Sequence, residues 1–136
     1  MARTNFENLD VYRLAEDLSD QIWKVVLEWP HFARDTIGKQ IVRSADSIGA
    51  NIAEGSGRKA FLDNRRFVRI ARGSLNETQH WLRRAYKRHL LKQDQVETIK
   101  QSLDELAPRL NAFLKSIGKL AGTQAATNNG QRTTNN

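Results

Sequence analysis

The stretch that decides the fold is residues 60–90, AFLDNRRFVRIARGSLNETQHWLRRAYKRHL. Its apolar and small residues recur at helical spacing. At about 100° per residue these positions share one broad face. That face consists of Phe67, Ile70, Ala71, Ser74, Leu75, Thr78, Trp81, Leu82 and Ala85. We therefore expect one long amphipathic helix over about 60–90, with this face turned toward a core.

Two stretches before it have the same periodicity. The first covers about 8–29 and ends at Trp29-Pro30, because proline disfavours helix in the residue before it. The second covers about 36–55 and carries a narrow isoleucine stripe. Its expected N-cap is Asp35 or Thr36, and Gly55-Ser56-Gly57 should stop it with a left-handed residue.

A fourth periodic stretch covers about 93–117 and contains Pro108. Proline lacks an amide and displaces the carbonyl four residues back, so it should bend this helix. The apolar stripe keeps its phase across Pro108, which predicts one bent helix rather than two.

Short connections make consecutive helices antiparallel neighbours. The sequence therefore predicts an all-α fold, an antiparallel up-down four-helix bundle over residues 1–118. After Gly118 the composition changes to Ala, Gly, Thr, Asn and Gln with little apolar bulk. Such a segment buries too little surface to offset its ordering entropy, so we expect a disordered polar tail over 119–136.

Composition excludes several classes of protein. The chain contains no cysteine, which excludes disulfides, thiolate nucleophiles and cysteine-ligated zinc. It has no apolar run of the length that a membrane span or a secretory signal needs. We expect a cytoplasmic protein with no membrane partner.

The positive charge is concentrated in one segment. The whole chain carries +7, and residues 58–92 hold eleven of its 22 Lys and Arg but only two of its 15 Asp and Glu. That segment is therefore +9 and the remainder −2. Arg outnumbers Lys within it, and the guanidinium fork matches phosphate and carboxylate oxygens.

Helical angles place much of this charge on a ridge opposite the apolar face. A ridge of this kind favours a polyanion bound through its backbone, with steep salt dependence and no reading of bases. The alternative is a solvated face, or one paired with acids of a neighbouring helix or subunit. The predicted nucleic-acid-binding residues are Arg58, Arg65, Arg66, Arg69, Arg72, Arg83, Arg84, Lys87 and Arg88.

The sequence offers little support for catalysis. Glu77 and His80 have the spacing of a di-metal motif, but that site needs a second such pair, which the chain lacks. His31 and His89 have no Asp or Ser at a spacing that suggests a triad. We predict no enzyme activity, no metal and no cofactor.

Other polar and small residues suggest a structural or interface role. Ser47, Asn51 and Glu54 form a polar ridge beside the isoleucine stripe, and Glu54 lies where a carboxylate opposes the helix dipole. Gly73 would allow a close helix approach. We expect these residues to cap a segment, pack two helices or contact another subunit.

Two stretches carry a family resemblance. They are residues 43–55, RSADSIGANIAEG, and residues 70–77, IARGSLNE. Together they resemble bacterial four-helix-bundle proteins first met in intervening sequences of large-subunit ribosomal RNA genes. The resemblance covers about 5–118 and implies a homopentamer without known catalytic activity. We expect Glu77, which lies in the second stretch, to have a structural or interface role. A related branch, the accessory protein of diversity-generating retroelements, binds a reverse transcriptase and nucleic acid.

Three hypotheses follow. The first is a non-enzymatic, homopentameric RNA- or DNA-binding accessory protein. The alternative is an interaction module whose basic ridge docks an acidic partner such as a reverse transcriptase. In the third, the basic helix is buried at a subunit interface against acidic helices.

Overall fold

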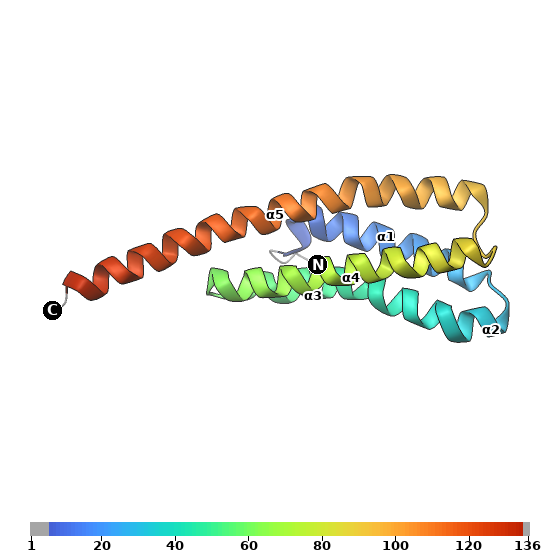
Figure 1. The fold of residues 1–136 in the computed structure, drawn as a ribbon, viewed down its shortest axis with the longest axis horizontal. Coiled ribbons are helices and arrows are strands. Elements are labelled where there is room, and N and C mark those ends of the chain that lie inside the picture. Colours follow the sequence, from blue (N-terminus) through green and yellow to red (C-terminus); the bar gives the residue numbers. More distant parts are fainter. Residues whose placement is uncertain (1–5, 135–136) are drawn as a thin grey trace.

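Four long helices form the fold in the computed structural model, which describes residues 6–134 (Figure 1). Each long helix packs against the next along the chain, and the last also packs against the first. The predicted antiparallel up-down four-helix bundle is therefore confirmed. The elements in chain order are the 3-10 turn η1 (Phe6–Asn8), α1 (Asp10–Leu27), α2 (His31–Ala33), the π-helical segment η2 (Arg34–Gly38), α3 (Lys39–Ser56), α4 (Phe61–Lys87) and α5 (Gln93–Thr134).

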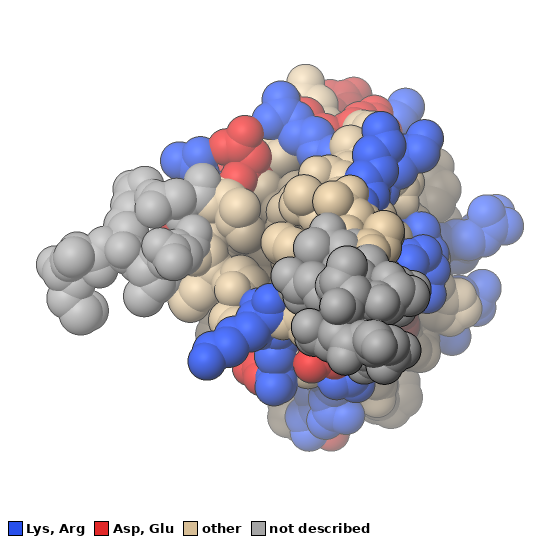
Figure 2. Space-filling model, turned by 90° about the vertical axis from the view of Figure 1, so that its left-hand side faces the viewer, with Lys and Arg blue, Asp and Glu red and all other residues tan. Residues whose placement is uncertain are grey.

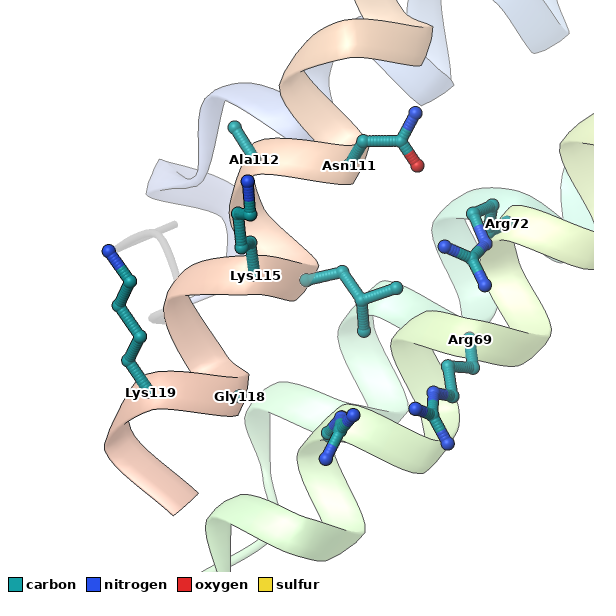
Figure 3. Close-up of a pocket in the computed structure, with 9 residues that line it drawn as sticks. Arg69, Arg72, Asn111, Ala112, Lys115, Gly118 and Lys119 are labelled. Carbon is teal, nitrogen blue, oxygen red and sulfur yellow. The ribbon is translucent and has the colours of Figure 1, made fainter. Parts of the chain in front are cut away.

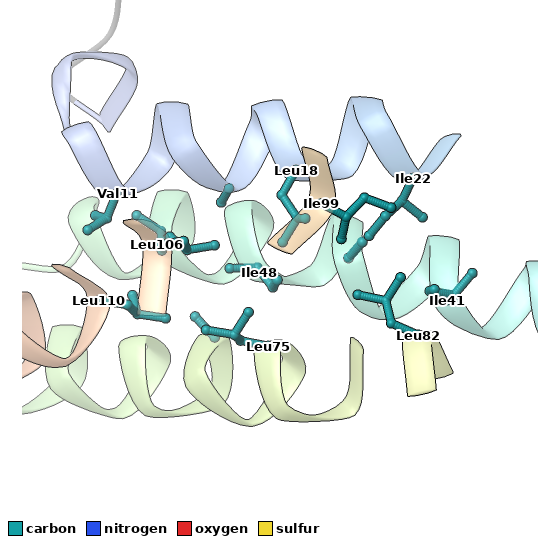
Figure 4. Close-up of a cluster of buried hydrophobic side chains, with 14 of the residues drawn as sticks. Val11, Leu18, Ile22, Ile41, Ile48, Leu75, Leu82, Ile99, Leu106 and Leu110 are labelled. Carbon is teal, nitrogen blue, oxygen red and sulfur yellow. The ribbon is translucent and has the colours of Figure 1, made fainter. Parts of the chain in front are cut away.

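The core lies between these four helices, and each of them contributes aliphatic side chains to it (Figure 4). Full burial of one Leu, Ile or Val side chain stabilises the fold by about 1.5–3 kcal/mol. The apolar stripes therefore determine how each helix is rotated. Buried members include Val11, Leu18 and Ile22 of α1, Ile41 and Ile48 of α3, Leu75 and Leu82 of α4, and Ile99, Leu106 and Leu110 of α5.

The buried face of α4 is narrower than the sequence predicted. Val68 and Ala71 are fully buried, whereas Ile70 remains 43% exposed and Trp81 is half-buried. Ile70 lies about 200° around the helix from the buried Val68, so these two side chains point to opposite sides of α4. The structure places Ile70 on the outer surface of α4.

The second long helix begins earlier than predicted. Helix starts at His31 directly after Pro30 and passes through η2 into α3 without a break. The prediction that Asp35 or Thr36 caps it is therefore wrong: Thr36 donates its hydroxyl hydrogen bond back to the Phe32 carbonyl at 2.7 Å. Pro30 is the N-cap residue of this helix, a position where an amide would have no helical partner.

Gly55 allows two helices to pack closely, and the prediction that 55–57 stops the helix with a left-handed residue is wrong. Within the described residues no glycine has a positive φ, and Gly57, the C-cap of α3, has φ −82°. A Cβ on Gly55 would lie 2.7 Å from Asn64 Oδ1 and 3.1 Å from the Asn64 carbonyl oxygen. Glycine therefore lets the start of α4 approach the end of α3.

The left-handed residue lies at the end of α4 instead. His89 has φ 60°, and the Leu90 amide donates to the Ala85 carbonyl at 3.0 Å. The His89 amide donates to the Tyr86 carbonyl at 3.1 Å. This pair of bonds is the Schellman motif, which satisfies carbonyls that the helix end leaves free.

Helix α5 continues through Pro108 as one bent helix, as predicted (Figure 1). A disordered polar tail is expected over 119–136 from composition, whereas the structure continues α5 as helix to Thr134, and this last part projects beyond the bundle (Figure 1). Ala121 is still buried and extends the apolar stripe by one turn past Ile117. The segment after Gly118 also contains no proline to interrupt the helical hydrogen bonds. Residues 135–136 lie outside the described residues.

Candidate functional site

A groove of about 860 Å³ runs between the first half of α4 and the middle of α5 (Figure 3). Five of its lining residues are basic and none is acidic. We call it the basic groove and define it by Arg65, Arg69 and Arg72 of α4 and Lys115 and Lys119 of α5. Arginines thus form one wall, and the two lysines extend along α5 on the other side (Figure 3).

Helical periodicity brings these side chains together. On α4, Val68, Ala71 and Leu75 point into the core, which turns the three arginines toward the flank that faces α5. On α5, Leu114 and Ile117 are buried, and the lysines lie beside them at the surface. The same packing that builds the core therefore builds the basic groove.

The basic groove holds positive charge that the fold leaves unneutralised. Among residues 6–134, none of its five cations forms an ion pair. Arg65 and Arg69 are one helical turn apart, as are Arg69 and Arg72, and such like-charge pairs repel by a few tenths of a kcal/mol. A bound anion would relieve this repulsion.

Two other predicted residues are engaged within the chain. Arg58 lies in the connection between α3 and α4, and it donates to Glu54 at 2.6 Å. Its guanidinium also lies 4.8 Å from the centre of the Phe67 ring. Arg66 lies 4.7 Å from the same ring and 3.9 Å from Asp63. Cation–π contact and nearby carboxylates make these two arginines less available to an external anion.

The rest of the predicted ridge lies at the other end of α4. Arg83 and Lys87 are exposed, Arg84 is half-buried, and Arg88 is the C-cap of the helix. None of the four lines the basic groove. The end of the bundle where α4 begins shows much more Lys and Arg surface than Asp and Glu surface (Figure 2).

The residues predicted for structural roles have separate positions. Ser47 shares a hydrogen bond of 2.9 Å with Ser74 between α3 and α4, and Asn51 donates to the Ser47 carbonyl at 2.8 Å. Glu77 accepts a hydrogen bond from the Trp81 indole at 3.3 Å. Gly73 is exposed, with no atom within 4 Å of a would-be Cβ, so no helix of this chain approaches it.

A second hydroxyl pair lies deeper between the same helices. Thr78 is fully buried and donates to Ser44 Oγ at 2.9 Å, and its hydroxyl also lies 2.8 Å from the Ser74 carbonyl. The α3–α4 contact is thus polar at Ser44, Ser47, Ser74 and Thr78 as well as apolar. Buried hydroxyls need such partners, because an unsatisfied one costs about 1–3 kcal/mol.

Sequence reasoning missed Lys115, Lys119 and Asn111, which complete the basic groove from α5. The available signal was the spacing of the two lysines, four residues apart beside the apolar stripe. That signal does not say which flank of α5 faces α4. Only the packed bundle places the lysines next to the arginines.

The described residues offer no metal site or membrane span. Within residues 6–134 no group of three or more His, Cys, Asp or Glu is placed to hold a metal ion. His80 instead packs edge-on against the Trp81 ring, with centroids 4.8 Å apart. None of the helices in that range is long and apolar enough to cross a bilayer.

Comparisons with known proteins agree with the fold. A solved structure from Bacteroides thetaiotaomicron, a protein of unknown function from the S23 ribosomal protein family, is similar with a TM-score of 0.68 and 27% identity. The similarity covers 77% of this chain and 98% of that one. Among curated proteins, none matches. The sequence model of the 23S rRNA-intervening sequence proteins matches residues 7–112, most of the bundle, and the chain therefore belongs to that family.

Proposed function

We propose that this protein binds the sugar-phosphate backbone of RNA or DNA through the basic groove, and that it does so without catalysing a reaction. One observation carries the proposal: five cations line one groove, and none forms an ion pair with a described residue. Phosphate oxygens are suitable ligands because guanidinium donates to them in bidentate fashion.

The dimensions of the arginine wall fit a nucleic-acid strand. Arg65 and Arg72 are seven residues apart on one helix, which is about 10 Å along its axis. One strand of a duplex presents a phosphate about every 3.4 Å along its axis, so about three phosphates would lie beside this wall. We expect these cations to contact phosphates rather than base edges, and therefore to show little sequence preference.

Salt-dependent filter binding to a labelled RNA or DNA duplex tests the proposal. If all five cations contact phosphates, log K should fall with log salt at a slope of up to about −4.5. Replacing Arg65, Arg69 and Arg72 with Gln should reduce that slope by about 2.7 and weaken binding strongly at low salt.

The matched control changes Arg83, Lys87 and Arg88 to Gln. It removes the same charge from the end of α4 that lies outside the basic groove. We expect the control to lose much less affinity than the groove variant. Equal losses would show that only net charge matters, and salt-independent or absent binding by the wild type would refute the proposal.

We further propose that the protein acts as a homopentamer, as its family resemblance implies. The exposed face of α4 supports an interface there, because Leu62 is 59% exposed, Ile70 is 43% exposed and Gly73 leaves open space. Light scattering tests this: a chain of 15.5 kDa should give a particle of about 78 kDa. A monomer mass would contradict it.

An acidic protein partner would contact the same guanidinium groups through carboxylates. Purification with and without nuclease separates the two cases. Bound nucleic acid that nuclease removes supports the proposal. A stoichiometric acidic protein, such as a reverse transcriptase, that resists nuclease would favour the interaction module instead.

A further inference from the structure

A second groove, of about 350 Å³, lies between the end of α1 and the segment that runs from η2 into α3. We call it the Trp23 groove. Part of its lining is apolar, the exposed Arg34, Lys39 and Arg43 form what we call its cationic rim, and no acidic residue lines it. The side chains that define it are Trp23, Val26, Arg34, Lys39, Val42 and Arg43.

The aromatic wall is an exposed indole. Ile22, Val25 and Val26 point into the core, so the helical period turns Trp23 outward, where it is 54% exposed. Trp29, by contrast, is buried. An exposed indole offers a flat apolar surface to a partner, and aromatic side chains of this kind stack on nucleic-acid bases.

The cationic rim is largely free to contact an anion. Within residues 6–134, Arg34 and Arg43 form no ion pair, whereas Lys39 contacts Asp35 at 2.7 Å. The Asp35 carboxylate accepts a hydrogen bond from Lys39, which lowers the pKa of Asp35. The rim thus keeps two guanidinium groups available beside the indole.

The local backbone fixes the width of the Trp23 groove. Its second wall comes from the π-helical segment η2, an uncommon conformation that occurs frequently at functional sites. A Cβ on Gly38 would lie 2.9 Å from Val26 Cγ1 and 3.2 Å from the Ala33 carbonyl oxygen. Glycine at this position therefore keeps the wall close to α1.

We propose that the Trp23 groove binds an unpaired base of a single-stranded nucleic acid, with the Trp23 indole stacked on the base and Arg34 and Arg43 contacting the flanking phosphates. Every base has a π face, so this contact tolerates any sequence but requires that the base be unstacked. Charge complementarity selects this occupant, because the rim is cationic and no carboxylate lines the groove.

The inference rests on the proposed function but uses a separate surface. The Trp23 groove lies at the end of the bundle near α2, and the basic groove lies toward the end where α4 begins (Figure 1). The basic groove should bind duplex and single strand alike through phosphates. The Trp23 groove adds a preference for single strands.

The test measures binding of a labelled oligouridine of about 12 nucleotides and of a duplex of equal length, within the usual range of single-strand site sizes. Trp23→Leu should weaken single-strand binding on the order of 5- to 150-fold and leave duplex binding nearly unchanged. Phe32→Ala is the matched control, because Phe32 is an exposed aromatic at the same end that does not line the groove.

Fluorescence gives an independent readout. With Trp81 replaced by Phe, tryptophan emission comes only from Trp23 and the buried Trp29. Oligouridine should quench the emission of Trp23, whereas the duplex should not. Adding Trp23→Phe should remove this quenching. Changing Arg34 and Arg43 to Gln should lower the single-strand salt slope by about 0.7 for each of the two arginines that binds a phosphate.

Each outcome separates this inference from the proposed function. Equal effects of Trp23→Leu on single strand and duplex, or no quenching, would overturn the inference and leave the basic groove standing. An emission change that depends on protein concentration without oligonucleotide would also overturn it, in favour of a second copy of this chain. If the wild type binds neither nucleic acid, both proposals fail.

Discussion

The same substitution at two glycines should change stability in opposite directions. Gly55→Ala places a methyl group 2.7 Å from Asn64 Oδ1, 3.0 Å from Phe67 Cβ and 3.1 Å from the Asn64 carbonyl oxygen. The amide end of Asn64 can rotate away, but its backbone carbonyl cannot. Gly73→Ala meets no atom within 4 Å.

The expected magnitudes follow from these contacts. Overpacking destabilises a fold by about 1–3 kcal/mol. Replacing glycine by alanine inside a helix stabilises the helix by about 1 kcal/mol. Because one close atom is the Asn64 backbone oxygen, which cannot rotate away, we expect an overpacking cost of about 2–3 kcal/mol. After the gain in helix propensity is subtracted, Gly55→Ala should lower the free energy of unfolding by about 1–2 kcal/mol. Gly73→Ala gains helix propensity without any close contact, so it should raise the free energy of unfolding by about 0.5–1 kcal/mol.

Urea denaturation followed by circular dichroism measures both variants. The measurements need equal protein concentrations, because assembly of subunits would make stability concentration-dependent. A Gly55→Ala variant as stable as the wild type would refute the claim that Gly55 sets the α3–α4 approach. If Gly73→Ala lowers stability and the oligomer mass together, Gly73 lies at a subunit contact.

Three further predictions concern stability, each measured by thermal or urea unfolding. Thr78→Val should cost about 1 kcal/mol, because it removes the buried hydroxyl that bonds to Ser44; the added change Ser44→Ala should recover part of this loss. His89→Gly should stabilise by about 0.5–1 kcal/mol by relieving the positive φ, and an unchanged midpoint would contradict this. Pro108→Ala should stabilise by about 1–2 kcal/mol, since the Asp104 carbonyl regains a helical partner; a loss of stability would show that the core needs the bend.

The sequence predicted the fold because periodicity and connection length constrain a helical bundle tightly. The stripes that include Leu18, Ile48 and Leu106 are visible without coordinates, and those side chains are buried in the structure. Helix starts were harder to predict. A capping rule favoured Asp35 or Thr36, but the helix starts at His31 after Pro30 and continues through η2.

The sequence predicted the arginines of the basic groove but not its lysines. Arg65, Arg69 and Arg72 follow from the period of one helix. Whether an arginine is engaged with its own chain does not follow from that period. Arg58 and Arg66 belong to the predicted ridge, yet both contact the Phe67 ring and a carboxylate.

By itself, then, the sequence determined four amphipathic helices, the family to which they belong and the concentration of charge on one of them. These properties depend on spacing within a single helix, which the order of residues specifies directly. Tertiary structure alone decided that Lys115 and Lys119 join the arginines, that Gly55 permits a close approach, and that an indole and two free arginines share the Trp23 groove. The physical reason is that these contacts depend on how neighbouring helices are rotated and spaced, and burial of the whole core fixes that arrangement.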